Sequence, residues 1–336
     1  MIAVIIVTYN SEDIIRNCLD SLARSEGEAL RVVICDNAST DATVQVVRDW
    51  SAERRVDFDE IYAPATGQPT ADFTLLRSPR NLGFAGGVNR GLEFLLRDAQ
   101  CDLFWLLNPD CEIETTTASA FRRRAHTSGA FSLMGSRILY CDAPGLIQSD
   151  GGRVGRWTGI CRNLNQGGDP RFAIRPDARD IDFISGASVV ASRDFIEAVG
   201  LMREDYFLYY EEVEWAARRG DLPLLLCNEA LVHHQGGTAI GSGSITRRAS
   251  PLALYFNYRN RMRYLAQVNP IALPVSCLAS LARILKLAVH RAWPEAWAAL
   301  LGMFQLPPPS WVRAVLSEDA AEYAFGRRLS STTAPR

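Results

Sequence analysis

Hydrophobic and polar positions alternate in blocks along the first hundred residues, in the order strand then helix. Continuous apolar runs predict buried strands at 2–7, 32–35, 73–76 and 103–107. Apolar residues spaced three or four apart predict a helix after each of the first three strands. The polar stretch 51–72 is expected to form a long surface loop. Repeated strand–helix units predict a parallel sheet with right-handed crossovers.

The second half of the chain has a less regular pattern. The expected elements are a helix at 115–127, a strand at 131–139, a loop-rich insertion at 141–180, a strand at 183–190 interrupted by Gly186, a helix at 194–199 capped by Ser192, a strand at 222–227 and a largely apolar helical region from 251 to about 306. We therefore expect an α/β domain with a helical C-terminal extension.

The strand at 103–107 is the most apolar of the set and should lie in the middle of the sheet. Pro109 has no N–H group for the sheet, so the chain must turn there. The turn delivers Asp110 to the carboxyl edge of the strand, where open α/β sheets bind their ligands. We expect Asp110 to hold a divalent metal, and an Asx turn that merely closes the strand is the alternative.

A glycine-rich segment, 80–91, lies between the third strand and its helix. Glycines let the backbone approach a ligand closely, and a helix N-terminus offers N–H groups to phosphate. A tight strand-to-helix turn would explain the same glycines. A dinucleotide-binding Rossmann motif is not expected, because Thr8, Tyr9 and Asn10 follow the first strand where that motif has glycines.

The composition limits which binding partners and which cellular compartment we expect. The 336 residues suffice for one large domain with an appendage, and 36 basic against 38 acidic side chains give no reason to expect nucleic acid. Eight scattered cysteines without a Cys-x-x-Cys pair favour reduced thiols in the cytoplasm. Met1 leads directly into the first strand, so we interpret the start as structure and not as a signal peptide.

Four motifs occur in order along the chain. They are Val4–Asn10 (VIIVTYN), Asp36–Asp41 (DNASTD), Asn81–Asn89 (NLGFAGGVN) and Leu107–Asp110 (LNPD). Together they resemble glycosyltransferase family 2, most closely its rhamnosyltransferase and galactofuranosyltransferase branches, and the resemblance extends to residue 240. It implies a GT-A fold, the nucleotide-diphospho-sugar transferase fold, with a mostly parallel central sheet flanked by helices. A nucleotide-sugar half would span 1–110 and an acceptor half 111–240.

The resemblance also implies where the donor binds. Thr8, Tyr9 and Asn10 would touch the nucleoside, and Asp36 the base or ribose. The residues expected along the rest of the donor are Asn81, Gly83, Phe84, Gly87, Asn89, Asn108 and Asp110. Asn108 and Asp110 occupy the place of the family's Asp-x-Asp motif, with Asp110 the ligand of Mg or Mn. One negative charge fewer at 108 suggests looser metal binding.

The acceptor side is expected at two further segments. Ser185, Gly186 and Ala187 resemble a Ser-Gly-Ala element lining the donor sugar, although the glycine could simply admit an aromatic neighbour. Glu211, Glu212 and Glu214 lie among aromatic residues at 206–215. The family has Glu-Asp here with the Asp as general base, so Glu212 would take that role. Glu211 is the fallback, and an acidic helix start is the structural alternative.

Two adjacent histidines precede a Gly-Gly pair at 236–237. A histidine is more often a packed or surface residue than a ligand, but the family has one here that completes the metal site or contacts the diphosphate. The spacing to the glycines and Thr238 favours His233 over His234.

The last hundred residues differ in character. Residues 241–250 are expected to be a flexible basic loop that orders over the donor, and 327–336 a disordered tail. The region 251–326 should be helical, and its uncharged run 271–282 is interpreted as too short to span a bilayer. Apolar faces flanked by cations through 251–306 fit a helix at the membrane surface, whereas packing on the body or on a second copy of the chain is the alternative.

The predicted reaction is inverting, metal-dependent transfer of a sugar, rhamnose or similar. The donor would be a dTDP- or UDP-sugar, and the acceptor a hydroxyl of a cell-surface polysaccharide or lipid-linked glycan. We expect a cytoplasmic enzyme, peripheral at the inner face of the cell membrane. A non-catalytic sugar-nucleotide-binding scaffold is the main alternative. A nucleotidyltransferase is disfavoured, because no glycine-rich basic loop follows the first strand.

Overall fold

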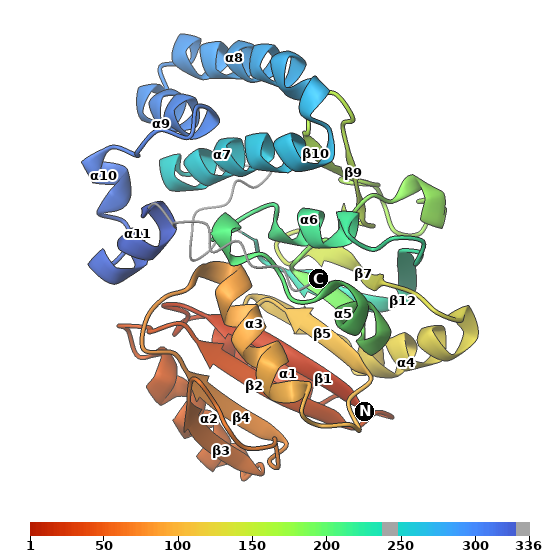
Figure 1. Cartoon of the computed structure of the whole chain (residues 1–336). Helices are drawn as coiled ribbons and strands as arrows, with labels where there is room; N and C mark the ends of the chain where they lie inside the picture. The colour runs from red at the N-terminus through yellow and green to blue at the C-terminus, as the bar shows by residue number, and fades with distance from the viewer. Residues whose placement is uncertain (237–247, 327–336) are drawn as a thin grey trace.

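A single mixed sheet runs through the molecule (Figure 1), and the computed structural model describes residues 1–236 and 248–326. The strand order is β3-β4-β2-β1-β5-β11-β7-β12-β6, with β8 paired to β7. The strands are β1 (Ile2–Thr8), β2 (Leu30–Asp36), β3 (Phe58–Tyr62), β4 (Phe73–Arg77), β5 (Leu103–Leu107), β6 (Cys111–Ile113), β7 (Leu133–Tyr140), β8 (Ile147–Ser149), β11 (Ser188–Ser192) and β12 (Leu225–His234). The short strands β9 (Gly152–Val154) and β10 (Cys161–Asn163) form a separate antiparallel pair.

The N-terminal half is the predicted parallel sheet, covered by helices on both faces. Ile2, Val4 and Ile6 of β1 pack in one core with α1 (Ile15–Ala23) and α2 (Thr43–Arg54). Ala3 and Ile5 pack in the other core with α3 (Gly83–Leu95). Alternate residues of each strand are therefore buried on opposite faces, which explains the continuous apolar runs.

The central position predicted for β5 is confirmed. All five of its residues are buried, with β1 parallel on one side and β11 antiparallel on the other. Because β11 runs the opposite way, its first residue Ser188 lies opposite Leu107, the last residue of β5. The loop before β11 thus reaches the edge where β5 ends, and the Asn108 N–H donates to the Ala187 carbonyl at 3.0 Å.

The predicted loop at 51–72 was wrong in part. Helix α2 continues to Arg54, and β3 is an edge strand parallel to β4. Its residues are exposed or half-buried, so it lacks the apolar run by which the other strands were recognised. The strand expected at 183–190 begins only at Ser188, and the insertion at 141–180 contains β8, β9 and β10.

The glycine-rich segment is the start of α3 and not a loop. A Cβ on Gly87 would lie 2.5 Å from a Val7 methyl, and one on Gly91 would lie 2.7 Å from Ile5. These glycines let the helix approach β1 closely, which supports the tight-turn interpretation at positions 87 and 91.

Helices of the C-terminal half complete the fold. They are α4 (Thr117–Ser128), α5 (Arg193–Val199), α6 (Glu211–Ala217), α7 (Pro251–Val268), α8 (Leu273–Val289), α9 (Trp293–Met303), α10 (Ser310–Arg313) and α11 (Glu318–Phe325), with short 3₁₀ turns at Ala178–Asp180, Glu204–Tyr206 and Pro270–Ala272. Helices α7 to α11 form a layer beyond one edge of the sheet, and α8 lies farthest from it (Figure 1). The helices predicted for 251–326 are confirmed, with the last of them ending at Phe325.

One part of the C-terminal prediction was wrong. The helical stretch Pro270–Val289 is long and apolar enough, by length and composition, to cross a membrane. The sequence interpretation counted only the uncharged run, whereas the helix continues past Arg283 and Lys286. The predicted flexible residues 241–247 and the tail 327–336 lie outside the described residues.

Candidate active site

A cleft of about 690 Å³ opens where β5 ends. Eleven of the residues expected from the sequence line it: Tyr9, Asn81, Gly83, Phe84, Asn108, Asp110, Ser185, Gly186, Ala187, Glu211 and Glu212. Segments far apart in the chain therefore meet at one edge of the sheet, as the positions of the strand ends predict.

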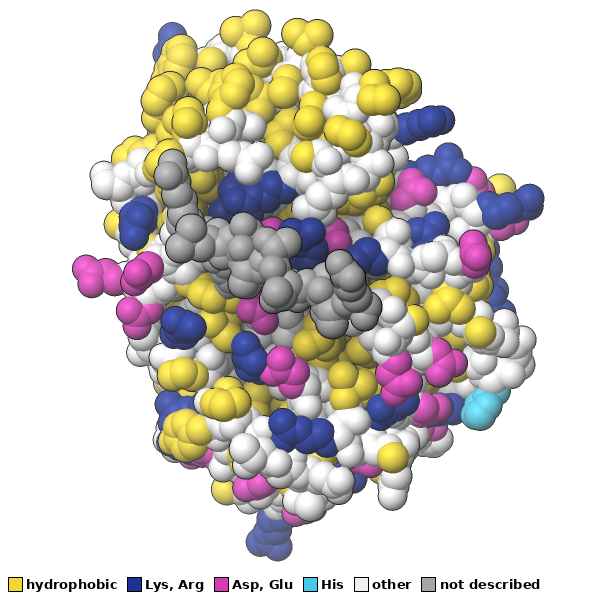
Figure 2. Space-filling view, viewed as in Figure 1, with side chains coloured by type: hydrophobic (Ala, Val, Ile, Leu, Met, Phe, Trp, Pro, Cys, Tyr) yellow, Lys and Arg dark blue, Asp and Glu magenta, His cyan; other side chains and the backbone are white. Residues whose placement is uncertain are grey.

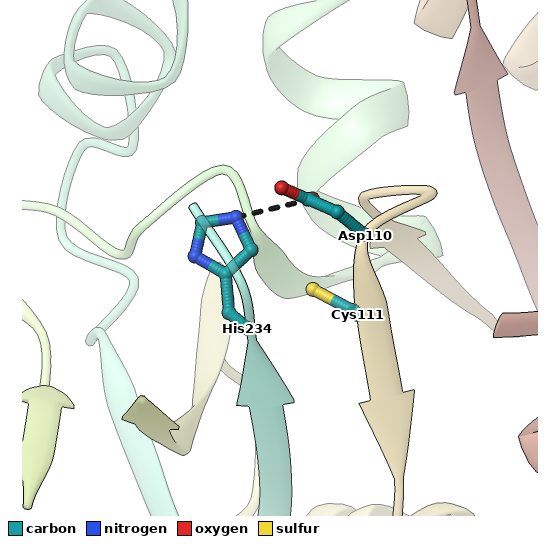
Figure 3. Close-up of side chains that lie close together, drawn as sticks. All are labelled: Asp110, Cys111 and His234. Atoms are coloured by element: carbon teal, nitrogen blue, oxygen red, sulfur yellow. Dashed lines mark ion pairs between the residues drawn. The ribbon is translucent and has the colours of Figure 1, made fainter. Parts of the chain in front are cut away.

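Asp110 faces His234 across the ends of β6 and β12 (Figure 3). The His234 Nε2 and an Asp110 carboxylate oxygen are 3.2 Å apart. The other carboxylate oxygen of Asp110 accepts from the Gly236 N–H at 3.2 Å. The two side chains are largely buried, at 7% exposed for Asp110 and 14% for His234.

The structure places His234, and not the predicted His233, beside Asp110. The His233 Nε2 contacts Glu114 at 3.2 Å. Neighbouring residues of a strand point to opposite faces, so only one of the two histidines can face the cleft. His234 pairs with Cys111 across the β12–β6 ladder, which brings its ring beside Asp110.

The Asp110–His234 pair fits a divalent cation. His234 Nδ1 is 2.6 Å from the Gln148 side-chain oxygen. An amide oxygen only accepts, so Nδ1 donates to it and Nε2 is the ring atom turned toward the carboxylate. A carboxylate and an imidazole nitrogen that face each other at this distance can both bind one cation, and an Asp–His set with phosphate oxygens suits Mg or Mn.

Cys111 lies beside this pair but is a poor ligand. Its thiol is fully buried and lies 3.3 Å from the Ala187 carbonyl, to which it donates. Burial, with a smaller contribution from the Asp110 charge, holds the pKa of Cys111 well above its usual range. Since only the thiolate binds metal well, Cys111 packs the floor of the site.

Glu211 and Glu212 are the first two residues of α6, and both line the cleft. Burial raises the pKa of Glu212 to about 7. Burial and the adjacent Glu212 charge raise the pKa of Glu211 well above its usual range. Glu211 is 3% exposed and one of its carboxylate oxygens is buried without a hydrogen-bond partner in the described residues. The buried environment therefore favours the neutral form of Glu211, and Glu212 is the better placed of the two to accept a proton near neutral pH.

The loop before α6 is strained and is held by α7. Phe207, Tyr209 and Tyr210 all have positive φ values, 63°, 67° and 71°, a conformation that costs an L residue about 1–2 kcal/mol. The Asn260 side-chain N–H₂ lies 2.8, 2.7 and 2.9 Å from the carbonyls of Tyr206, Leu208 and Tyr209. Asn260 is fully buried.

The neighbouring Arg259 adds a second contact to the same loop. Its guanidinium donates to the Tyr206 carbonyl at 2.7 Å, and its Nε donates to the Asn260 oxygen at 3.0 Å. The conformation that presents Glu212 thus depends on two adjacent residues of α7, which the sequence gave no local signal to identify.

Gly186 and Gly83 lie where separate segments of the chain pack closely together at the cleft. A Cβ on Gly186 would lie 3.6 Å from Phe84 and 3.9 Å from the Glu212 Cβ, so the loop before β11 lies close to Glu212. Gly83 has φ +73°, and a Cβ there would lie 2.2 Å from the Phe207 carbonyl. Only glycine fits at 83, and the Phe84 N–H donates to that carbonyl at 2.8 Å.

Several predicted donor residues lie outside the cleft lining. Asn89 uses both ends of its amide on the Met202 backbone, at 2.9 and 3.0 Å, so its role is structural. The buried Thr8 hydroxyl donates to Asp36 at 3.3 Å, and burial raises the pKa of Asp36. These contacts stabilise the turn after β2, and Asn37 lines the cleft beside it.

The two remaining residues predicted to bind the donor, Asn10 and Gly87, also lie outside the cleft lining. Asn10 is exposed and its side-chain oxygen accepts from the Thr40 N–H at 2.9 Å. Gly87 packs against Val7. The structure also adds cleft residues that were not predicted: Val7, Ser11, Ile14, Asn37, Pro109, Tyr140, Gln148, Asn163, Gln166, Phe207, Leu208, Tyr209, His234, Gly236, Leu252, Val315 and Leu316. Asn37 belongs to the motif DNASTD, in which Asp36 had been predicted as the residue that binds the base or ribose.

Comparison with known proteins gives a consistent picture. Residues 3–163 match the family model "Glycosyl transferase family 2". The low-salt glycan biosynthesis hexosyltransferase Agl10 of Haloferax volcanii is 26% identical over 265 residues, covering 77% of this chain and 74% of Agl10.

Two solved structures share the fold at low sequence identity. The Pyrobaculum calidifontis mannosyltransferase PcManGT, in complex with GDP-Man and Mn²⁺, is 16% identical with a TM-score of 0.53, covering 90% of this chain and 86% of that one. S. aureus TarS 1–349, in complex with UDP-GlcNAc, is 15% identical with a TM-score of 0.52, covering 96% and 88%. The predicted GT-A type of fold is thereby confirmed.

Proposed function

We propose, from the match of residues 3–163 to the glycosyltransferase family 2 model, that the chain is a member of that family and transfers a hexose from a nucleoside diphosphate to a glycan hydroxyl with inversion. The observation that carries the proposal is the placement of two kinds of group in one cleft. Asp110 and His234 lie at the strand edge, and Glu212 lines the same cleft beside Gly186 of the loop 185–187.

Each side chain has a defined task in this reaction. Asp110 and His234 would hold a divalent metal, which when bound stabilises the negative charge of the departing diphosphate. Glu212 accepts the proton of the acceptor hydroxyl as the new bond from oxygen to the anomeric carbon forms and the bond to diphosphate breaks on the opposite face. The raised pKa of Glu211 favours its neutral form, so that no second negative charge lies beside Glu212. The glutamate reaches about one bond further than the family's aspartate.

The donor we propose is a nucleotide sugar bound together with a divalent metal. PcManGT was solved with GDP-Man and Mn²⁺, and TarS with UDP-GlcNAc, which supports a nucleotide sugar and a metal in this type of cleft. The motif resemblance favours rhamnose or galactofuranose carried on dTDP or UDP. The acceptor we propose is a polysaccharide or lipid-linked glycan, in keeping with the glycan biosynthesis named for Agl10.

The test is release of nucleoside diphosphate from a panel of nucleotide sugars with Mg or Mn, with and without EDTA. Asp110→Ala should reduce release at least ~100-fold, the scale of losing an electrostatic stabiliser of the transition state. Glu112→Gln is the matched control, because Glu112 is an exposed carboxylate two residues further on. Donor binding without release by the wild type would support the scaffold alternative and refute transferase activity.

A further inference from the structure

An exposed apolar surface covers the outer side of α8 and the start of α9. Its members are Ile271 (77% exposed), Val275 (43%), Leu278 (69%), Leu281 (41%), Leu285 (65%), Val289 (71%), Trp293 (64%) and Trp297 (52%). We call this set the α8–α9 surface. Hydrophobic side chains gather there at the top of the molecule, over the helices that Figure 1 shows farthest from the sheet (Figure 2).

Helix α8 differs from an ordinary surface helix in which side chains it buries and which it exposes. The buried residues of its inner face are Ser276, Ser280 and Ile284, whereas leucines and valines face outward. An amphipathic helix in water buries its apolar stripe, so this pattern indicates that the outer face meets an apolar medium. A contiguous apolar patch of this kind marks an interaction site.

Two hydrogen bonds hold α8 flat against the body. The Ser276 hydroxyl donates to the Thr158 carbonyl at 2.7 Å, and Arg261 donates to the Ser280 hydroxyl at 2.7 Å. The helix also packs on α7 and α9. A helix anchored to the body along its inner face lies across a surface; it is not free to cross a bilayer alone, although its length and composition would permit a span.

Basic side chains predominate beside this surface, and the one acidic residue within it, Glu295, is half-buried and pairs with Arg248. From Val268 to Pro294 the sequence contains three basic residues, Arg283, Lys286 and Arg291, and no Asp or Glu. All three are exposed. Cations beside an apolar helix face complement the negative surface of an anionic bilayer, and tryptophans are suited to the interface between headgroups and acyl chains.

The exposed apolar residues continue along the chain toward the cleft. After α9 they include Phe304 (56%), Leu306 (48%), Trp311 (45%) and Val315 (61%). Val315 and its neighbour Leu316 line the cleft itself. A medium in contact with the α8–α9 surface would therefore lie near the wall of the active site that the C-terminal helices supply.

We propose that the α8–α9 surface docks peripherally into the interface of an anionic lipid bilayer, and that the glycan acceptor is carried on a lipid in that bilayer. The second clause rests on the proposed transferase function. Docking would present a membrane-bound acceptor to the cleft while the sheet and the donor-binding edge remain in water.

The first experiment measures binding of the full chain to vesicles by flotation. Vesicles of phosphatidylcholine with about one-third phosphatidylglycerol should float the protein, and Leu278→Glu with Leu285→Glu should weaken binding at least tenfold. Both side chains are exposed, so folding should be preserved. Ile174→Glu is the matched control, because Ile174 is 86% exposed on a different part of the chain. Unchanged binding by the double variant overturns the proposal.

Three further measurements test the contribution of charge and exclude a spanning helix or a second copy of the chain. Arg283→Ala and Lys286→Ala should each weaken binding roughly fivefold, the factor that corresponds to about 1 kcal/mol per basic side chain near an anionic surface. Alkaline carbonate should release the bound protein; retention would show a spanning helix and refute peripheral docking. A stable dimer in lipid-free sedimentation that Leu278→Glu abolishes would show that a second copy covers the surface, and would also refute it.

The acceptor clause has its own readout. With donor alone, the Leu278→Glu, Leu285→Glu variant should release nucleotide at the wild-type rate, while transfer to a lipid-linked acceptor in vesicles falls at least tenfold. Equal transfer by variant and wild type refutes the acceptor clause. Vesicle binding by a wild type that releases no nucleotide would leave docking supported and refute the proposed function, so the two failures are distinguishable.

Discussion

Replacing Asn260 by Ala should disable catalysis while leaving the donor-binding edge intact. The Asn260 amide lies within hydrogen-bonding distance of three backbone carbonyls of the loop that ends in Glu211 and Glu212. Alanine leaves these buried acceptors without this donor. The loop contains three positive-φ residues, so it has an intrinsic tendency to relax once this contact is lost.

The magnitude follows from the contacts. A buried acceptor left unsatisfied costs about 1–3 kcal/mol, and an NH₂ group has two hydrogens to share among three carbonyls, so the free energy of unfolding should fall by about 2–4 kcal/mol. A domain with about 5–15 kcal/mol of stability survives this loss. A relaxation that moves Glu212 by about 1 Å would reduce kcat ~100-fold, because proton transfer depends on near-contact geometry.

The assay is steady-state transfer with donor and acceptor varied, preceded by a thermal melt to choose a temperature at which the variant is folded. We expect kcat to fall ~100-fold with little change in the KM for the donor. Asn257→Ala, at a half-buried position on the same helix, is the matched control and should retain wild-type rates. A folded Asn260→Ala protein with wild-type kcat would refute the idea that α7 positions the base.

Three further predictions concern the ionisable groups. First, the acceptor-dependent rate should rise with pH up to about 7, where Glu212 becomes deprotonated, and Glu212→Gln should lower kcat at least ~100-fold and abolish this limb; a pH profile of kcat/KM tests both. Second, the folded state binds a proton at Glu211 that the unfolded chain releases in the ordinary carboxyl range. The free energy of unfolding should therefore decrease as the pH rises above that range, and Glu211→Gln should flatten the decrease in urea titrations; an unchanged slope contradicts the raised pKa. Third, His234→Ala should weaken activation by Mn at least tenfold whereas His233→Ala should not, as metal titrations of activity would show; the reverse order would restore the original preference.

The sequence predicted the centre of the site better than its periphery. The apolar run ending in Pro109 and Asp110 identified both the central strand and the carboxylate that lines the cleft at its end, because burial and the missing N–H of proline act locally. Glu212 was identified through a motif resemblance. Asn260 was not, since its partners lie more than fifty residues away in the chain and no local pattern reports such a contact.

Two errors have specific physical causes. The register of β12 against β7 shifts between Cys227 and Leu231, so counting alternate residues along the apparent strand does not show which of His233 and His234 faces Asp110. Asn89 belongs to a recognised motif, yet its amide forms hydrogen bonds with the backbone of Met202, which lies before α6 in the chain. Motif membership does not separate ligand-binding from structural residues.

The reversed direction of β11 has a consequence for how new specificities could arise. Its preceding loop, which carries Gly186, enters the active site from outside the run of parallel strands β3, β4, β2, β1 and β5. Phe183, Ile184 and Ala187 of this loop are buried, whereas Ser185 and Gly186 are half-buried and line the cleft. Exchanges at 185–186 would therefore alter the cleft wall while the pairing of the parallel strands, and the residues that those strands supply, stay unchanged.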